Sequence, residues 1–176
     1  MYALELRRFR LLSWPFRSPF SSPLWLALRM YLGLIWMTFG LGKIRAGWLT
    51  SNPLRPLLTA VAEGQTQTPM DFYTHVARLM VDTGADGLLS VLIPLAEVAV
   101  AISFFSGVLL VPAAIVAIGI NVNLILAGIA SVHFDGRIIV MQVLLLAAWR
   151  VAGLLGVGTL VRRMWPRLHH VRRATA

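Results

Sequence analysis

A few charged and amide side chains interrupt the long apolar runs of this sequence, and these are the residues that could do chemistry. Arg29, Glu97 and Arg150 each stand within a mainly apolar run, and Asn121 and Asn123 share another. A charge at the centre of a membrane-spanning helix costs about 2.5–3.5 kcal/mol even on a lenient insertion scale. Such groups must therefore find partners, bind a ligand or carry protons, and they are the first candidates for a site.

The spacing in the first apolar run brings several candidates onto one helix face. Arg29, Trp36 and Lys43 follow one another at intervals of seven, and Gly33 and Gly40 lie between them at steps of four and three. Steps of three and four return to the same side of a helix, so this face is small, polar and aromatic. Glycines at such spacing let a second helix approach closely.

Depth in the membrane predicts partners for Glu97. Counted from the inner ends of the runs, Arg29 and Arg150 lie about 8 to 11 Å deep and Glu97 about 13 Å. Arginine side chains span that difference, so the sequence predicts a buried Arg29–Glu97–Arg150 cluster. In the alternative, both arginines reach back to the inner head groups, and Glu97 is protonated or bonded to backbone. Asn121 and Asn123 are rotated by about 200° from each other, and Asn123 is expected to face inward.

Four apolar runs must position these groups, and each is long enough to cross a membrane as a helix. With 58% hydrophobic residues, 13% charged residues and a mean hydropathy of +0.76, the chain lies outside the range of soluble proteins. A spanning helix needs about 20 mainly apolar residues, and no run alternates as a barrel strand would. The sequence therefore predicts an all-α membrane protein, a four-transmembrane-helix bundle with spans at residues 24–42, 87–105, 108–130 and 138–157.

The distribution of Lys and Arg predicts the orientation of the bundle. Four arginines precede the first span and five follow the fourth, whereas residues 43–86 balance basic with acidic side chains. Short cytoplasmic flanks retain positive charge. We therefore expect cytoplasmic tails at residues 1–23 and 161–176, a transmembrane domain at 24–160, and an outer loop at 43–86. The expected location is the plasma membrane, crossed several times, with both termini in the cytoplasm. Lipid head groups explain the net charge of +9, and no nucleic acid is expected.

The outer loop is too long for a simple connection, and it carries two helix signals. Asn52-Pro53 can start a short helix with apolar residues at steps of three and four. Thr68-Pro69-Met70-Asp71 resembles a capping box and can start a second helix. We expect two short amphipathic helices that form a lid on the outer surface. They either cover a ligand or simply cover the mouth of the bundle.

The absence of cysteine removes several kinds of redox chemistry. Disulfides, dithiol pairs, iron–sulfur clusters and covalently attached c-type haem all need cysteine. The four histidines fall outside the predicted spans and lack the spacing of metal ligands. We therefore expect no metal site and no covalently bound cofactor. Redox activity would need a diffusible ligand, such as a quinone, or a partner subunit.

Four segments, taken in order, resemble the DoxX/DoxD family of small four-helix membrane proteins. They are residues 28–43 (LRMYLGLIWMTFGLGK), 94–101 (PLAEVAVA), 121–128 (NVNLILAG) and 149–156 (WRVAGLLG). The outer loop, which ends in the aromatic segment Asp71-Phe72-Tyr73, is similar to that of the DoxD branch. The chain departs from the pattern at Gly156-Val157-Gly158-Thr159, where relatives often carry an acidic residue.

This resemblance implies a class of function. DoxD is the small subunit of a thiosulfate:quinone oxidoreductase, and other relatives are associated with membrane redox complexes, thiol stress or methylamine metabolism. By resemblance the chain would be an integral membrane subunit of a quinone-linked redox complex, with quinone as its ligand and other subunits as its partners. The resemblance assigns no catalytic residue, but it agrees with the polar positions found from spacing and depth: Arg29, Lys43, Glu97, Asn123 and Arg150.

Two functions remain open from the sequence. In the first, the bundle binds quinone in an apolar cleft near Trp36, and Glu97 or Asn123 holds the head group or passes protons. In the second, the bundle is a noncatalytic anchor or assembly subunit that packs against a larger membrane complex. A solute transporter is disfavoured, because the chain is short and its halves do not repeat.

Overall fold

The computed structural model describes residues 14–66 and 70–157, and this part of the chain is all-helical. Most of the predicted tails and the Thr68-Pro69 pair of the predicted capping box lie outside the described residues. The elements are a 3-10 helix η1 (Pro19–Ser21) and the α-helices α2 (Ser22–Arg45), α3 (Leu54–Ala62), α4 (Phe72–Asp82), α5 (Ala85–Ser106), α6 (Leu110–Leu126), α7 (Val132–Ala147) and α8 (Trp149–Ala152).

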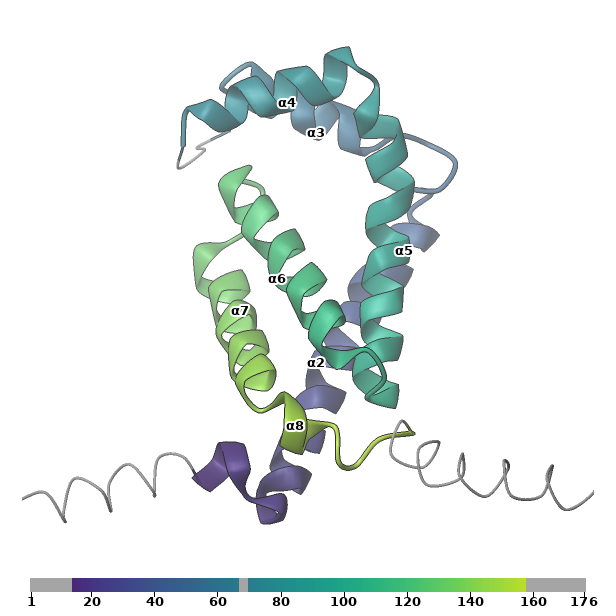
Figure 1. The fold of residues 1–176 in the computed structure, drawn as a ribbon. Coiled ribbons are helices and arrows are strands. Elements are labelled where there is room, and N and C mark those ends of the chain that lie inside the picture. Colours follow the sequence, from purple (N-terminus) through teal and green to yellow (C-terminus); the bar gives the residue numbers. More distant parts are fainter. Residues whose placement is uncertain (1–13, 67–69, 158–176) are drawn as a thin grey trace, which may run out of the picture.

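The helices form a lengthwise bundle with two helices across one end (Figure 1). Helix α2 packs along α5, α6 packs beside α7, and contacts between α5 and α6 join the two pairs. Helices α3 and α4 pack on each other and on the beginning of α5, and we call them the lid helices. The short α8 lies at the opposite end, against α2 and α7.

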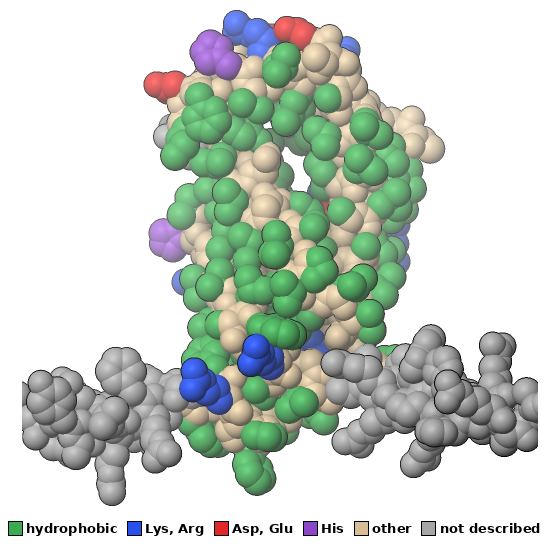
Figure 2. All heavy atoms as spheres, viewed as in Figure 1, with side chains coloured by type: hydrophobic (Ala, Val, Ile, Leu, Met, Phe, Trp, Pro, Cys, Tyr) green, Lys and Arg blue, Asp and Glu red, His purple; other side chains and the backbone are tan. Residues whose placement is uncertain are grey.

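The surface of the bundle is apolar along its length. Figure 2 shows hydrophobic side chains over most of the visible face, with charged side chains gathered mainly toward the two ends. The segments Pro19–Arg45 and Ala85–Ser106 are long and apolar enough to cross a membrane, and Leu110–Leu126 is a shorter apolar helix. A monomer in water rarely exposes so large a continuous apolar surface. These features indicate association with a membrane.

Close contact between α2 and α5 depends on glycine. A Cβ atom built on Gly40 would lie 2.7 Å from Val98 Cγ2 and 3.0 Å from both Pro94 O and Val98 N. One built on Gly33 would lie 2.7 Å from Phe105 Cε1. The two helices therefore run antiparallel in a fixed register, with Gly33 level with the end of α5 and Gly40 level with its middle. Gly33 and Gly40 are the residues that spacing placed on the close-packing face.

The third and fourth helices differ from their predicted bounds. Helix α6 ends at Leu126, because Gly128 adopts a positive φ of 68° and its N–H bonds to the carbonyl of Ile125. Glycine relieves the strain of this left-handed conformation, which ends many helices. Helix α7 begins at Val132 and ends at Ala147, so the prediction of one helix over residues 138–157 is wrong.

A buried carboxylate explains the early start of α7. The apolar pattern excluded Asp135 from the span, yet Asp135 is buried in the first turn of α7. A negative charge is favourable there, because the first turn of a helix exposes backbone N–H groups. After Ala147 the chain turns through Ala148 into α8, and carbonyls at and just beyond the end of α8 bind Arg29, as described below.

Polar contacts attach the lid helices to the bundle. Asp86, fully buried at the beginning of α5, accepts hydrogen bonds from Asn52 Nδ2 and from Arg55 Nε, the latter at 2.9 Å. The hydrogen bond from Arg55 to this carboxylate raises the pKa of Arg55. Apolar side chains of both lid helices form a second core with Ala127, at the end of α6: Leu54, Leu58, Val61, Tyr73 and Ala77.

Candidate polar chamber and apolar cavity

Glu97 is buried on α5 and forms an ion pair with Lys43 of α2. Lys43 Nζ donates to Glu97 Oε1 at 2.5 Å, and the two side chains are 21% and 1% exposed. The ammonium group also lies 5.7 Å from the ring centroid of Phe39 and 5.6 Å from that of Trp48. These distances fall within the range of cation–π attraction. A carboxylate and two aromatic rings therefore hold the Lys43 side chain in place.

The predicted Arg29–Glu97–Arg150 cluster is wrong. Arg29 is buried, but its Nη1 donates to Ala152 O at 2.7 Å and its Nη2 to Phe105 O and Leu155 O at 3.2 and 3.1 Å. Arg150 is exposed, with its guanidinium carbon 5.3 Å from the ring centroid of Trp149, so it is not part of a polar core.

Helix register explains this difference. Depth counting gave the arginines and Glu97 similar depths, but the antiparallel packing of α2 on α5 places Arg29 level with Gly107. A Cβ atom on Gly107 would lie 2.5 Å from Arg29 Nη1. Glu97 lies nearer the opposite end of α2, where Lys43 reaches it. Arg29 instead reaches the carbonyls of Ala152, where α8 ends, and of Leu155, which lies beyond that end.

A cavity of about 240 Å³ lies beside the Lys43–Glu97 pair, and we call it the polar chamber. Each lengthwise helix contributes a polar side chain to its lining: Lys43 from α2, Glu97 from α5, Asn121 from α6 and Asp135 from α7. Among the described residues, Glu97 Oε2 and Asn121 Nδ2 have no hydrogen-bond partner. An unsatisfied buried polar atom costs about 1–3 kcal/mol. These two atoms are therefore the ones that water or a ligand would satisfy.

Asn121, and not Asn123, faces the interior of the bundle. Asn121 is 1% exposed, whereas Asn123 lies on the side of α6 toward the lid and accepts a hydrogen bond from the Tyr73 hydroxyl. The prediction that Asn123 faces inward is wrong. The buried stripe of α6 runs through Ala113, Ala117 and Asn121 at steps of four. The spacing of these small residues could therefore have predicted that Asn121 faces inward.

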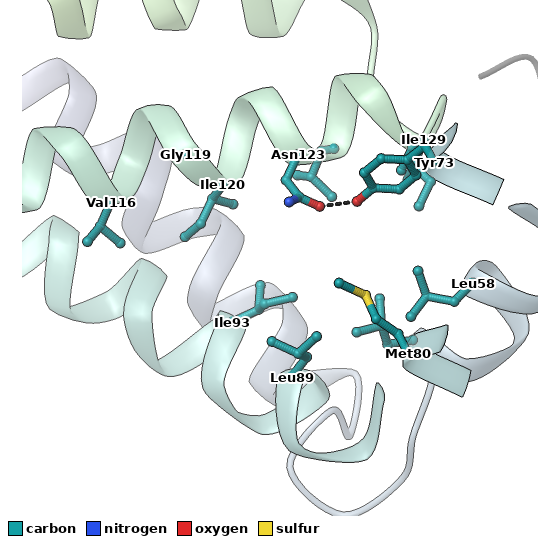
Figure 3. Close-up of a pocket in the computed structure, with 13 residues that line it drawn as sticks. Leu58, Tyr73, Met80, Leu89, Ile93, Val116, Gly119, Ile120, Asn123 and Ile129 are labelled. Carbon is teal, nitrogen blue, oxygen red and sulfur yellow. Dashed lines mark hydrogen bonds between the residues drawn. The ribbon is translucent and has the colours of Figure 1, made fainter. Parts of the chain in front are cut away.

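An apolar cavity of about 410 Å³ lies under the lid helices, between α5 and α6 (Figure 3). Its one polar feature in the close-up is the hydrogen bond that Tyr73 donates to Asn123 Oδ1. Burial raises the pKa of Tyr73, so its hydroxyl keeps its proton at neutral pH. The apolar cavity and the polar chamber are adjacent, because four residues line both: Leu54, Ile93, Leu124 and Ile129.

Trp36 does not form the predicted cleft. It is fully buried in the main core, where its ring packs edge-on to Phe39 at a centroid distance of 6.4 Å. It lines neither the polar chamber nor the apolar cavity. The polar chamber lies further along α2, at Phe39 and Lys43, and no residue of α2 lines the apolar cavity.

Sequence reasoning missed two polar residues of α7. Asp135 lines the polar chamber, and Gln142 is fully buried, with both amide atoms unpartnered among the described residues. The two belong to one buried stripe with Ile138 and Leu145, at steps of three and four. That spacing was visible in the sequence, but the apolar run used to predict the span began after Asp135.

Two further observations bear on the chemistry of the site. Within residues 14–66 and 70–157 there is no group of three or more His, Asp or Glu side chains placed to hold a metal ion. No family model, curated protein or solved structure matches the chain.

Proposed function

We propose that the protein is an integral membrane subunit of a quinone-linked redox complex of the DoxX/DoxD kind, and that the polar chamber holds the quinone head group. The observation that supports this proposal is that two adjacent cavities differ in the charged side chains that line them. The polar chamber holds three charged side chains and an amide among otherwise apolar lining residues, whereas the apolar cavity beside it holds no charged side chain, and Tyr73 and Asn123 are its polar residues. A membrane quinone has the same division, with a polar ring joined to an isoprenoid tail.

The side chains of the polar chamber match both oxidation states of such a ring. A bound quinone would accept electrons together with protons and so become the hydroquinone. Lys43 and Asn121 carry N–H groups that can donate to carbonyl oxygens. Glu97 Oε2, which has no partner within the described residues, can accept from a hydroxyl group. Because the chain has no cysteine, we assign the electron-transferring centre to another subunit of the complex.

The proposal includes a bundle that crosses the membrane four times, through α2, α5, α6 and α7. Large apolar side chains are exposed along α6 and α7 as they are along α5: Ile115, Val116, Val140 and Val143 are examples. The described chain begins and ends at the same end of the bundle, opposite the lid (Figure 1). An even number of spans and cytoplasmic termini agree with this arrangement and with the basic tails.

A binding measurement on purified protein tests the proposal. In mild detergent, a short-chain quinone should quench tryptophan fluorescence with saturation, because Trp48 lines the polar chamber. Asn121→Leu should weaken binding about tenfold, since it removes a donor to a ring oxygen. Gln142→Leu is the matched control, because it removes a buried, unpartnered amide that lines neither cavity. Absence of quinone binding, or equal binding by both variants, would contradict the proposal. The alternative function, a noncatalytic membrane anchor or assembly subunit, would then be favoured.

A further inference from the structure

A groove of about 540 Å³ lies at the end of the bundle opposite the lid, and we call it the α8 groove. Residues 107–112, from the turn between α5 and α6 and the first turn of α6, form one wall. Residues 149–154, from α8 and the turn after it, form the other. The polar chamber shares no lining residue with this groove, so the groove is a separate site.

Arg29 holds the two walls together. Its guanidinium donates to Phe105 O, beside the first wall, and to Ala152 O and Leu155 O, within and beside the second. It also packs directly beneath Gly107, where a Cβ atom would lie 2.5 Å from Nη1. The partners of this guanidinium are backbone carbonyls, which do not neutralise its charge. A buried positive charge therefore lies behind the wall of the groove at Gly107.

Arg150 adds a second positive charge at the surface of the groove. It is exposed and lies against the ring of Trp149 at 5.3 Å. The ion pairs within the described residues are those of Lys43 with Glu97 and of Arg55 with Asp86, so neither arginine of the groove has an acidic partner there. No Asp or Glu occurs in residues 98–134 or 136–157. The groove therefore favours an anion.

The walls require that the anion also have an apolar part. Apart from Arg150, the lining consists of glycine, leucine, valine, proline and tryptophan. Leu109 has a φ of 53° and is 69% exposed at the rim. This left-handed conformation is strained for a leucine, and such strain concentrates at binding sites. A free phosphate ion would leave this apolar surface in water.

We propose that the α8 groove binds an anionic phospholipid of the adjacent leaflet. The phosphate group lies at Arg150, where the buried charge of Arg29 behind Gly107 adds attraction, and an acyl chain lies along the apolar wall of residues 109–112. Charge-assisted hydrogen bonds from a guanidinium to phosphate give the selectivity for anionic lipid. Trp149 belongs at the interface between head groups and acyl chains, where tryptophan is enriched. This proposal is independent of quinone binding.

Native mass spectrometry of the detergent-purified full chain tests this proposal. The probes are phosphatidylglycerol and the zwitterionic phosphatidylcholine. The wild type should retain phosphatidylglycerol in preference, and Arg150→Gln should reduce that retention about five- to tenfold. The matched control is Arg137→Gln, which removes an exposed arginine of α7 outside the groove and should leave retention unchanged.

A second variant separates loss of charge from loss of the groove itself. Val111→Trp fills the groove while keeping both arginines, and it should also reduce retention of phosphatidylglycerol. Equal retention of the two lipids by the wild type, or equal losses in the Arg150 and Arg137 variants, would overturn the proposal. Displacement of bound lipid by millimolar inorganic phosphate would assign the groove to a free anion and overturn it as well.

Discussion

Lys43 Nζ lies 2.5 Å from Glu97 Oε1, and this contact joins the end of α2 to the middle of α5. The pair stands at the edge of the polar chamber, with Glu97 Oε2 left unpartnered among the described residues. The carboxylate thus has two separate tasks, because one oxygen fixes Lys43 and the other remains available. The predictions below separate the residues that hold the bundle together from those that would bind a ligand.

Replacing Glu97 with Gln should lower the stability of the detergent-purified protein. The amide keeps the shape but removes the negative charge that pairs with Lys43, and a hydrogen bond to a charged group contributes about 1.5–3 kcal/mol. The measurement is the thermal unfolding midpoint by circular dichroism. Asp82→Asn, an exposed substitution at the end of α4, is the control and should leave the midpoint unchanged. An unchanged midpoint in the Glu97 variant would show that the ion pair does not support the fold.

Gly40→Ala should destabilise the protein, whereas Gly42→Ala should not. The new Cβ at position 40 would meet the backbone of α5 at 3.0 Å, and overpacking of this kind costs about 1–3 kcal/mol. At position 42 nothing lies within 4 Å, and alanine favours the helix over glycine by up to about 1 kcal/mol. Comparing the two unfolding midpoints checks the register of α2 on α5. Equal effects would mean that the two helices pack in a different register.

Arg55→Gln should loosen the attachment of α3 to the bundle. The side chain bonds to the buried carboxylate of Asp86 and also to Val81 O at 3.2 Å. Without it, Asp86 retains the bond from Asn52 but loses its ion-pair partner. Hydrogen exchange of the α3 amides should become faster, while exchange in α2 stays the same. Arg45→Gln, at the exposed end of α2, is the control. If α3 exchanges equally in the two variants, Asp86 does not hold the lid.

Tyr73→Phe should weaken the contact between α4 and α6 and change its pH dependence. The lost hydrogen bond to Asn123 contributes about 0.5–1.5 kcal/mol. Because burial raises the pKa of Tyr73, this tyrosine stabilises the fold below its ordinary pKa of about 10 and loses that contribution as the pH rises further. The wild-type unfolding midpoint should therefore fall more steeply above about pH 10 than that of the variant. Parallel curves would contradict the assignment.

The sequence predicted the helical class and the two longest helices, and the reasons are local. The segments Pro19–Arg45 and Ala85–Ser106 are single apolar runs, and length alone identifies them. Helix α7 was misplaced because a buried Asp135 opens it, and composition treats any carboxylate as a boundary. The turn at Ala148 carries no proline or glycine, so nothing local marked the break.

The polar contacts were predicted less well, because they depend on helix rotation and register. Spacing identified Gly33, Gly40 and Lys43 as one face of α2, and that face does meet α5. Depth alone could not identify the cation that reaches Glu97, because the partner depends on the lengthwise register of α2 against α5. Asn121 and Asn123 differ by rotation alone, and only the packing of α6 on its neighbours decides between them.

The bonds of Arg29 to Ala152 and Leu155 span 123 and 126 positions of the chain. In the proposed bundle α2 is the first membrane span, so the Arg29 guanidinium is synthesised well before the carbonyl groups of Ala152 and Leu155. Until then the charge costs about 2.5–3.5 kcal/mol on the insertion scale. The bonds that fix the first helix therefore form only after the last helices have been made. A chain that stops before residue 152 would leave its first helix poorly anchored and open to quality-control proteases.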